Sequence, residues 1–334
     1  MTGWDGVRLW GGGEDEVLAR LAAGADPCMP LGHDSALHVA AEHWPPAVVA
    51  AMAAAASNVD CLSDGRSPLW LAVHSRRHDN ARVLAAAGAD PWQPMMAGWS
   101  PGRLSLASPE PDLFGAAPAG VELSPAEREA VALAGELGER LQVDYYDGTG
   151  LLCVAGIDAT EAIRRLDGTP MTEDELLAHY DVDIDVDEEP EPGDEDDWGW
   201  LSEMNDLLLV GVTDVPGGCV ITQPWGYQPQ TPLIGRLLSA GTVAYGLYAN
   251  PKSGNQGSIH RDGETIGWDL HPGGAAWSTD TSQMVLLSYL YRLQAPAYAC
   301  AFVGLRPVDA QCITGPADQW VLLPDRNYWA SKTV

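Results

Sequence analysis

A run of carboxylates between Asp181 and Asp197 is the densest group of potential metal ligands in this sequence. It contains 11 acids in 17 residues, and "DVDIDVD" places oxygens at alternate positions, as calcium-binding loops do. An EF-hand loop also needs glycine at its sixth position and glutamate at its twelfth, where this run has Val186 and Pro192. We therefore expect a solvated, self-repelling loop rather than a metal site, and we leave open that it attracts a basic partner.

A glycine-containing loop and the cysteines are the next candidates for chemistry. The loop "NPKSGNQGS", residues 250–258, has the lysine and glycines of a phosphate cradle, but no helix follows whose N-terminus would complete such a site. We expect an ordinary loop between strands. The cysteines are far apart and form no CxxC pair, which predicts small buried residues and no zinc site. They are Cys28, Cys61, Cys153, Cys219, Cys300 and Cys312.

Small-ligand binding is a further candidate, and its residues lie in the second half of the chain. Trp225, Tyr227, His260 and Arg261 could line a cleft, with packing in the core as the alternative for the aromatic residues. His260 adjoins a predicted hairpin turn and His271 precedes Pro272, so we expect both histidines to be exposed. Seven of the 13 tryptophans belong to this half. They are Trp198, Trp200, Trp225, Trp268, Trp277, Trp320 and Trp329.

Composition limits the classes of partner. The chain has 334 residues and a net charge of −29, from 47 acids and 18 bases, so its surface repels nucleic acids and acidic membranes. The same charge attracts basic partners, although acidity can also serve solubility alone. The longest apolar stretch, residues 45–56, is too short to span a membrane. The N-terminus has acids where a signal peptide has basic residues, so we expect a cytoplasmic protein.

The first third of the chain repeats itself. "SALHVAA" at 35–41 matches "SPLWLAV" at 67–73 with an offset of 32, Ser100-Pro101 follows 33 residues later, and "AAGADP" occurs twice. This pattern resembles the ankyrin repeat over about residues 4–115, with two clear units and a degenerate unit at each end. Ser67 is a predicted helix cap before Pro68, and a second helix is expected at His78–Ala87. Such helix pairs bury too little surface alone, so the sequence predicts a stack.

The resemblance implies where a partner would bind, because ankyrin proteins use their loop tips and the exposed side of the first helix of each pair. On this chain those positions include Asp34, Glu42, His43, Asp64, Arg66, His74, Met96 and Trp99. The alternative for Met96 and Trp99 is that they cover the end of the stack. Trp70 is expected in the core, and His38 is expected to make a local hydrogen bond between helix and loop.

The rest of the chain predicts a connecting helix and a mixed domain. A capping box at Ser124–Glu127 opens the helix, which gives predicted domains of 1–120, 121–143 and 144–334. Strands are expected at "GLLCVAGI", "DLLLVGVTDV", "GGCVITQPW", "TVAYGLYAN" and "AYACAFVGL", with a hairpin turning on Asp262-Gly263. Helices are expected at "DATEAIRRL", "TPLIGRLLSAG" and "TSQMVLLSYLYRL". The expected fold is a helix-pair stack followed by an α/β sandwich with a largely antiparallel sheet.

This second part also resembles an uncharacterised domain family common in actinobacteria. The shared blocks are Gly156-Ile157 to Arg165-Leu166, "GGCVITQPWGY" at 217–227, Leu233 to Thr242, and the hairpin ending in "DG". Cys219 and Gln223 depart from the family's usual residues. The resemblance implies a fold and no activity.

The sequence as a whole favours a protein-binding protein without enzymatic activity. It has no GxSxG, HExxH or GxxxxGK[ST] motif, and it predicts no cofactor. We expect an inhibitor, immunity-type or regulatory protein that docks a basic partner through the ankyrin-like face. A ligand sensor using the Trp-rich second half, or an enzyme of unknown type there, are the alternatives. The oligomeric state is left open.

Overall fold

The computed structural model describes residues 3–4, 13–31, 33–143, 146–180 and 208–330. They form two compact units, the first comprising residues 1–132 and 275–292, the second residues 133–274 and 293–334. Residues 275–292 therefore group with the N-terminal helices, whereas the sequence analysis placed them in the range 144–334. The acidic run 181–197 lies outside the described residues. Within the described ranges, no helix is both long enough and apolar enough to cross a membrane.

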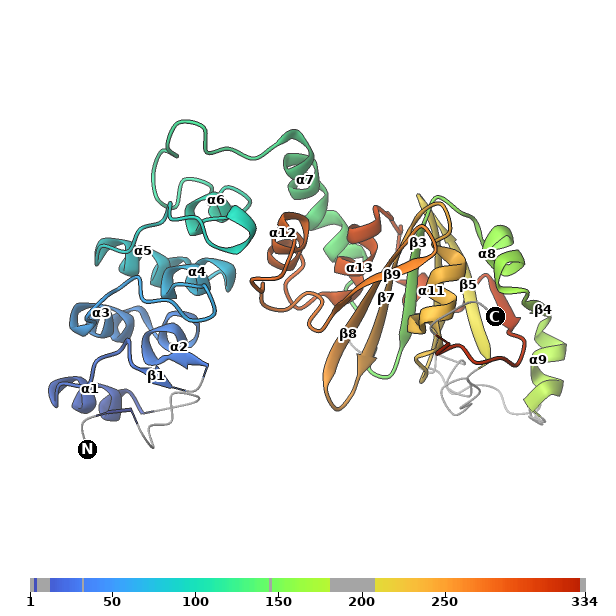
Figure 1. The fold of residues 1–334 in the computed structure, drawn as a ribbon, viewed down its shortest axis with the longest axis horizontal. Coiled ribbons are helices and arrows are strands. Elements are labelled where there is room, and N and C mark those ends of the chain that lie inside the picture. Colours follow the sequence, from blue (N-terminus) through green and yellow to red (C-terminus); the bar gives the residue numbers. More distant parts are fainter. Residues whose placement is uncertain (1–2, 5–12, 32, 144–145, 181–207, 331–334) are drawn as a thin grey trace, which may run out of the picture. The chain divides into compact units, whose positions relative to one another are not determined.

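The first unit is helical (Figure 1). Its elements are α1 Glu14–Ala22, β1 Pro30–Leu31, β2 Asp34–Ser35, α2 Ala36–His43, α3 Pro46–Ala55, α4 Pro68–His74, α5 His78–Ala86, η1 Met96–Gly98, α6 Pro101–Ser105 and α12 Ser282–Leu290. The helix α7, Pro125–Arg140, begins in this unit and ends in the second.

Serine caps explain where the short helices of this unit begin. The side chains of Ser35, Ser67 and Ser100 each accept a hydrogen bond from the backbone N–H three residues later, at the start of α2, α4 and α6. Proline follows Ser67 and Ser100 at the first helical position, where its missing N–H has no partner to lose. The predicted helix at 78–87 is confirmed as α5, and the chain leaves it through Gly88 at φ 102°, a conformation that favours glycine.

The helices pack in register along the unit. Each first helix contacts the next, α2 on α4 and α4 on α6, and the second helices α3 and α5 contact each other. Leu37, Leu69, Leu84 and Trp70 are completely buried between them. Val83, which the sequence predicts as buried, is half-buried. The helix pairs thus contact one another through buried apolar side chains.

The second unit is built on one eight-stranded sheet in which every pairing is antiparallel. The strand order is β4-β10-β5-β6-β3-β7-β8-β9. The strands are β3 Gly150–Ala155, β4 Thr169–Met171, β5 Leu209–Val215, β6 Gly218–Gln223, β7 Val243–Asn250, β8 Gly254–Arg261, β9 Glu264–Asp269 and β10 Gln319–Leu322. The helices are α8 Ala159–Leu166, α9 Glu173–Tyr180, η2 Gln228–Gln230, α11 Pro232–Leu238, α13 Ala295–Val303 and α14 Gln311–Thr314.

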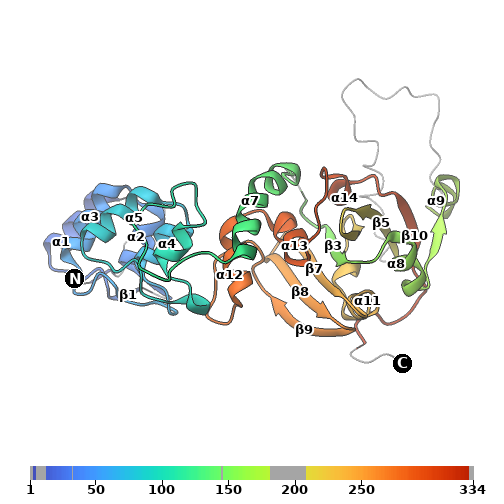
Figure 2. The ribbon, with the colours of Figure 1, turned by 90° about the horizontal axis from the view of Figure 1, so that it is seen from above.

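Helices cover both faces of this sheet (Figure 2). Leu152 and Val154 of β3 face the core formed with α8 and α11. Cys153, between them in the strand, points the other way and lies 3.6 Å from Cys300 of α13. The predicted antiparallel sheet with helices is confirmed, and so are the hairpin on Asp262-Gly263 and the capping box at 124–127; a second capping box joins Thr172 and Glu175.

One element was assigned the wrong type from the sequence. The apolar run "AYACAFVGL", expected to be a strand, lies mostly in the helix α13, which begins at Ala295 with Pro296 in its first turn and ends at Gly304 with φ 84°. A short apolar run is compatible with a buried strand or a buried helix, because neither leaves a polar face to set the period. The flanking proline and glycine are the signals that favour the helix.

Candidate functional site

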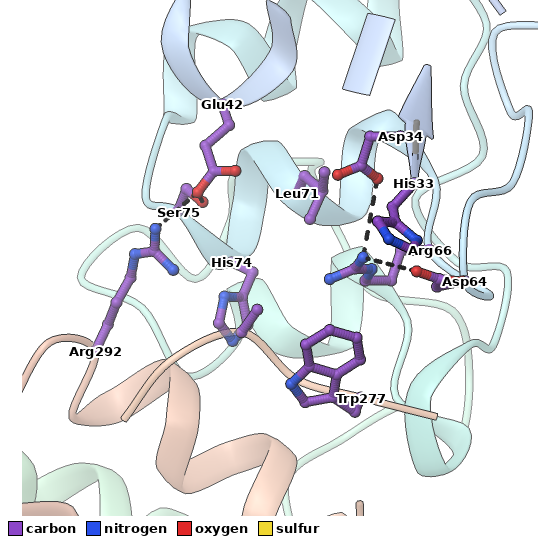
Figure 3. A pocket seen from close by; sticks show the side chains of 11 residues that line it. His33, Asp34, Glu42, Asp64, Arg66, Leu71, His74, Ser75, Trp277 and Arg292 are labelled. Atoms are coloured by element: carbon purple, nitrogen blue, oxygen red, sulfur yellow. Dashed lines mark hydrogen bonds and ion pairs between the residues drawn. The ribbon is translucent and has the colours of Figure 1, made fainter. Parts of the chain in front are cut away.

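A pocket of about 320 Å³ lies on the first unit (Figure 3). It brings together five of the eight residues that the sequence analysis assigned to partner binding. Its lining residues are His33, Asp34, Glu42, Asp64, Arg66, Leu71, His74, Ser75, Ala275, Trp277 and Arg292. Three carboxylates and two arginines thus share a pocket that also has apolar walls, from Leu71 and Trp277.

The repeat places four of these side chains in two matched pairs. Asp34 and Arg66 both stand immediately before a capping serine, 32 residues apart. Glu42 and His74 are separated by the same 32 residues, on α2 and α4. Because α2 and α4 pack side by side, Arg66 Nη2 lies 3.8 Å from Asp34 Oδ1, and Glu42 and His74 line the same pocket. The sequence repeat therefore places side chains from equivalent positions in the lining of one pocket.

A tight turn holds Arg66 in place. Asp64 and Gly65 both have positive φ, 47° and 77°, and Ser63 and Arg66 exchange two backbone hydrogen bonds of 2.9 Å across them. Asp-Gly favours this turn because both central residues must adopt left-handed conformations. The ring of His38 adds a bond from Nε2 to the Arg66 carbonyl at 2.9 Å, while its Nδ1 lies 2.7 Å from the Ser35 hydroxyl. The expected helix-to-loop role of His38 is confirmed.

The Arg66 guanidinium is buried and makes no side-chain hydrogen bond to any described residue. Its residue is 6% exposed, and Nη2 lies 3.8 Å from Asp34 Oδ1 and 3.7 Å from Asp64 Oδ2, beyond hydrogen-bond length. Arg66 Nε and Asp34 Oδ1 are both buried without a hydrogen-bond partner among the described residues. The guanidinium lies 5.3 Å from the centre of the Trp277 ring, a cation–π contact.

Glu42 organises the opposite side of the pocket. Its Oε1 accepts hydrogen bonds from the Ser75 hydroxyl at 2.7 Å and from Arg292 Nη2 at 2.8 Å, as Figure 3 shows. His43 Nε2 lies 3.5 Å from Oε2. Glu42 is thus the anchor of Arg292, a residue 250 positions away in the sequence.

His74 is fully enclosed where α4 meets α12. Its Nε2 lies 3.1 Å from the Ser288 hydroxyl, and its ring stacks on Trp70 with centroids 6.2 Å apart. Burial, together with the positive charges of Arg292, Arg66 and Arg76, lowers the pKa of His74 to about 3. At neutral pH the pocket therefore contains a neutral imidazole, two arginines and three carboxylates.

The other three predicted partner-binding residues do not line this pocket. His43 has 40% of its side chain exposed and pairs with Glu42. Met96 and Trp99 are 2% and 0% exposed, so neither is accessible to a partner in this structure. The Trp99 indole donates to the Ser282 carbonyl and hydroxyl, at 3.1 and 2.9 Å, and Arg103 stacks on its ring at 4.0 Å. Both residues are therefore buried within the first unit, and the alternative that they cover the end of the stack stays a prediction.

The candidate ligand residues of the second unit have separate surroundings. Trp225, at φ 53° and 43% exposed, lies over Gly148, and Tyr227 packs against Tyr248 and Trp329. Arg261 is exposed, and His271 is exposed as expected.

His260 differs from the expectation of exposure, because it is completely buried. Its Nδ1 lies 3.0 Å from the Thr265 hydroxyl and its Nε2 2.9 Å from that of Ser258. Burial lowers its pKa to about 4, with a smaller contribution from Arg236. Adjacent residues of a strand point to opposite faces of the sheet, so His260 points into the core while Arg261 points to solvent.

The sequence analysis missed the pocket residues that come from residues 275–292. Trp277 was grouped with the tryptophans of the second half, and Arg292 was not singled out. Residues 275–292 contribute to the pocket because Arg292 donates a hydrogen bond to Glu42 and Trp277 makes a cation–π contact with Arg66. The sequence offered one tryptophan, Trp277, just before the predicted helix, and this does not indicate which unit the segment joins.

Comparison with known proteins adds no relative: no protein-family model matches the chain, and neither a curated protein nor a solved structure matches it significantly. The resemblances to ankyrin repeats and to the actinobacterial family therefore stay predictions. Among the residues that the structure describes, no group of three or more His, Cys, Asp or Glu side chains is arranged to hold a metal ion.

Proposed function

We propose that this chain is a protein-binding protein without enzymatic activity, which docks its partner on the first unit, built as an ankyrin-like stack, with the pocket at the centre of the contact. The observation that carries the proposal is the pocket's origin. Asp34 and Arg66 occupy equivalent positions of consecutive helix pairs, as do Glu42 and His74, which is how repeat proteins form extended binding surfaces.

The chemistry of the pocket supports the same conclusion. Arginine and tryptophan are the residue types that most often dominate binding energy at interfaces, and here they form adjoining walls. Trp277 is 40% exposed, so part of its indole is available to a partner. A concave site with charged groups beside apolar walls suits the recognition of a projecting side chain.

Charge supports a basic partner, which would make the chain an inhibitor or regulator of a basic protein. The first unit carries 17 acids and nine arginines, and the whole chain has a net charge of −29. Such a field accelerates encounter with a positive surface more than it strengthens the final complex. The association rate should therefore fall as salt rises, because ions screen the attraction.

A matched pair of substitutions tests the proposal. Asp64→Asn and Asp79→Asn remove the same charge from the same unit, but Asp64 lines the pocket and Asp79, with 80% of its side chain exposed, lies on α5. A protein captured at low salt from the cells that make this chain should be retained by the wild type and Asp79→Asn and lost with Asp64→Asn. If every captured protein binds all three alike, the pocket is not the docking site.

A further inference from the structure

We propose that the pocket recognises a primary carboxamide, the side chain of a glutamine or asparagine presented by the partner. This inference rests on the proposed function and identifies the group that enters its site. The ligand's oxygen accepts a hydrogen bond from the Arg66 guanidinium, and its two N–H groups donate to the carboxylates of Asp34 and Asp64.

The first argument is the unused hydrogen-bonding capacity of Arg66. A guanidinium has five N–H donors, yet its two ion pairs, at 3.7 and 3.8 Å, are too long to be hydrogen bonds. The Arg66 Nε–H is buried without a hydrogen bond, and such a group is costly to the folded state. A ligand oxygen that accepts from this guanidinium recovers part of that cost.

The second argument is charge. A carboxylate entering the pocket would approach Asp34 and Asp64, which already lie within 4 Å of Arg66. An ammonium group would approach the buried Arg66 itself. A neutral group avoids both repulsions, and it must offer an acceptor and donors together, because a guanidinium and carboxylates stand side by side.

The third argument is the fit of the amide's attached carbon chain. Leu71 and Trp277 supply apolar walls beside the charged residues, as Figure 3 shows. The methylene groups of glutamine or asparagine would pack on these walls while the carboxamide reaches Arg66. A carboxamide carries two N–H donors, so it can donate a hydrogen bond to each of two carboxylates, whereas a main-chain amide has one N–H and can donate to one.

Three small molecules of one size separate these alternatives without any partner protein. Propionamide, propionate and propylammonium are titrated into the full chain while the Arg66 Nε–H and Trp277 indole N–H signals are followed by NMR, with Trp277→Phe assigning the latter. Propionamide should give saturable shifts of both signals and bind about tenfold more tightly than either ion, the ratio expected for one hydrogen bond gained. Tighter binding of either ion, or no saturable shift with propionamide, overturns the proposal.

Two variants locate the binding. Arg66→Lys keeps the positive charge but loses the planar array of donors, and Asp34→Asn replaces an acceptor oxygen by a donor. Each should weaken propionamide binding about tenfold, whereas Asp79→Asn should not change it. The Trp99 indole signal, bonded to Ser282, reports whether each variant keeps the fold. If Arg66→Lys unfolds the unit, Asp34→Asn, whose side chain is 30% exposed, still decides the question.

The outcome is separable from that of the proposed function. If propionamide does not bind but Asp64→Asn still loses the partner protein, the carboxamide proposal is wrong and the proposed docking site is retained. Propionamide binding without any partner that depends on Asp64 would leave a carboxamide site and overturn protein docking.

Discussion

Each unit buries a histidine beside a serine hydroxyl, and the two surroundings differ. His74 is 1% exposed with Ser288 at 3.1 Å, and His260 is 0% exposed with Ser258 at 2.9 Å. Burial is the largest cause of a lowered pKa in both, to about 3 and about 4. His74 lines the charged pocket, while the ring of His260 is enclosed by Thr265 and packed on Gly235.

The comparison shows that a shifted histidine pKa does not by itself identify a binding site. Desolvation alone produces such a shift in the core of a sheet. The pocket differs because it contains charged side chains with buried polar atoms that form no hydrogen bond to any described residue. Arg66 and Asp34 are the clearest of these, since both have buried polar atoms without hydrogen bonds to any described residue.

The largest expected effect contrasts two arginines. Arg66→Met should destabilise the first unit by about 2–3 kcal/mol, because it leaves Asp34 and Asp64 without their counter-charge and removes the contact with Trp277. Arg261→Met, at an exposed position of the second unit, should change stability by less than about 0.5 kcal/mol. Urea unfolding measures both, and equal effects would remove the contrast between the units.

The pH dependence of stability tests what the two histidines share. Folding lowers the pKa of each below its usual 6.5, so their neutral forms contribute stability in full above pH 6.5, and that contribution is lost as pH falls toward the folded pKa values, about 3 for His74 and about 4 for His260. Lowering the pH from 7.5 to 5 should therefore reduce the free energy of unfolding by about 2 kcal/mol for each histidine.

Glutamine substitutions separate the two contributions. His74→Gln should reduce the loss between pH 7.5 and 5 in the first unit, where burial also lowers the pKa of His38, and His260→Gln should reduce the loss in the second unit alone. The window lies above the titration of the carboxylates whose pKa values are lowered, including Glu161 at about 2. An unchanged pH profile in His74→Gln would mean that this ring is accessible to water.

A smaller effect is expected at Gly235. A Cβ added there would lie 2.3 Å from the His260 ring, so Gly235→Ala should destabilise the second unit by about 1–2 kcal/mol despite alanine's better helix propensity. Gly267→Ala is the control, because its Cβ would meet Ile259 at an ordinary 3.8 Å. Thermal unfolding distinguishes the two, and a neutral Gly235→Ala would show that the ring can move aside.

The smallest effect is expected at the rim of the pocket. Asp64→Asn should alter stability by no more than about 0.5 kcal/mol, because Asp64 is 48% exposed and asparagine accepts its φ of 47°. Asp79→Asn should behave alike. A melting temperature that falls for Asp64→Asn alone would mean that this carboxylate stabilises Arg66 more than the exposed geometry implies.

The fold of the first unit was largely predictable because its signals are local. Ser67-Pro68 and Gly88 mark helix ends within a few residues, and the offset of 32 places Asp34 beside Arg66 without knowledge of the rest of the chain. The pocket residues supplied by the repeats follow from the same pattern. Trp277 and Arg292 could not be predicted, because nothing within residues 275–292 indicates a contact more than 200 residues away.

The second unit was less predictable at particular elements. Alternating runs such as "GGCVITQPW" indicate strands, and they were found as expected. The alanine-rich run in α13 has no polar face, so its period gave no choice between helix and strand. His260 was misplaced because proximity to a turn suggests exposure, whereas a residue two positions before Asp262 can still point into the core.

The first unit is formed by two separate stretches of the chain, and this affects how the protein folds during its synthesis. Trp99 finds its hydrogen-bond partner Ser282 only 183 residues later in the chain. A ribosome adding roughly 5–20 residues per second needs about 10–40 s to cover that interval. Until Ser282 has been synthesised, the Trp99 indole lacks this hydrogen-bond partner, so the first unit cannot complete its packing before most of the chain has been made.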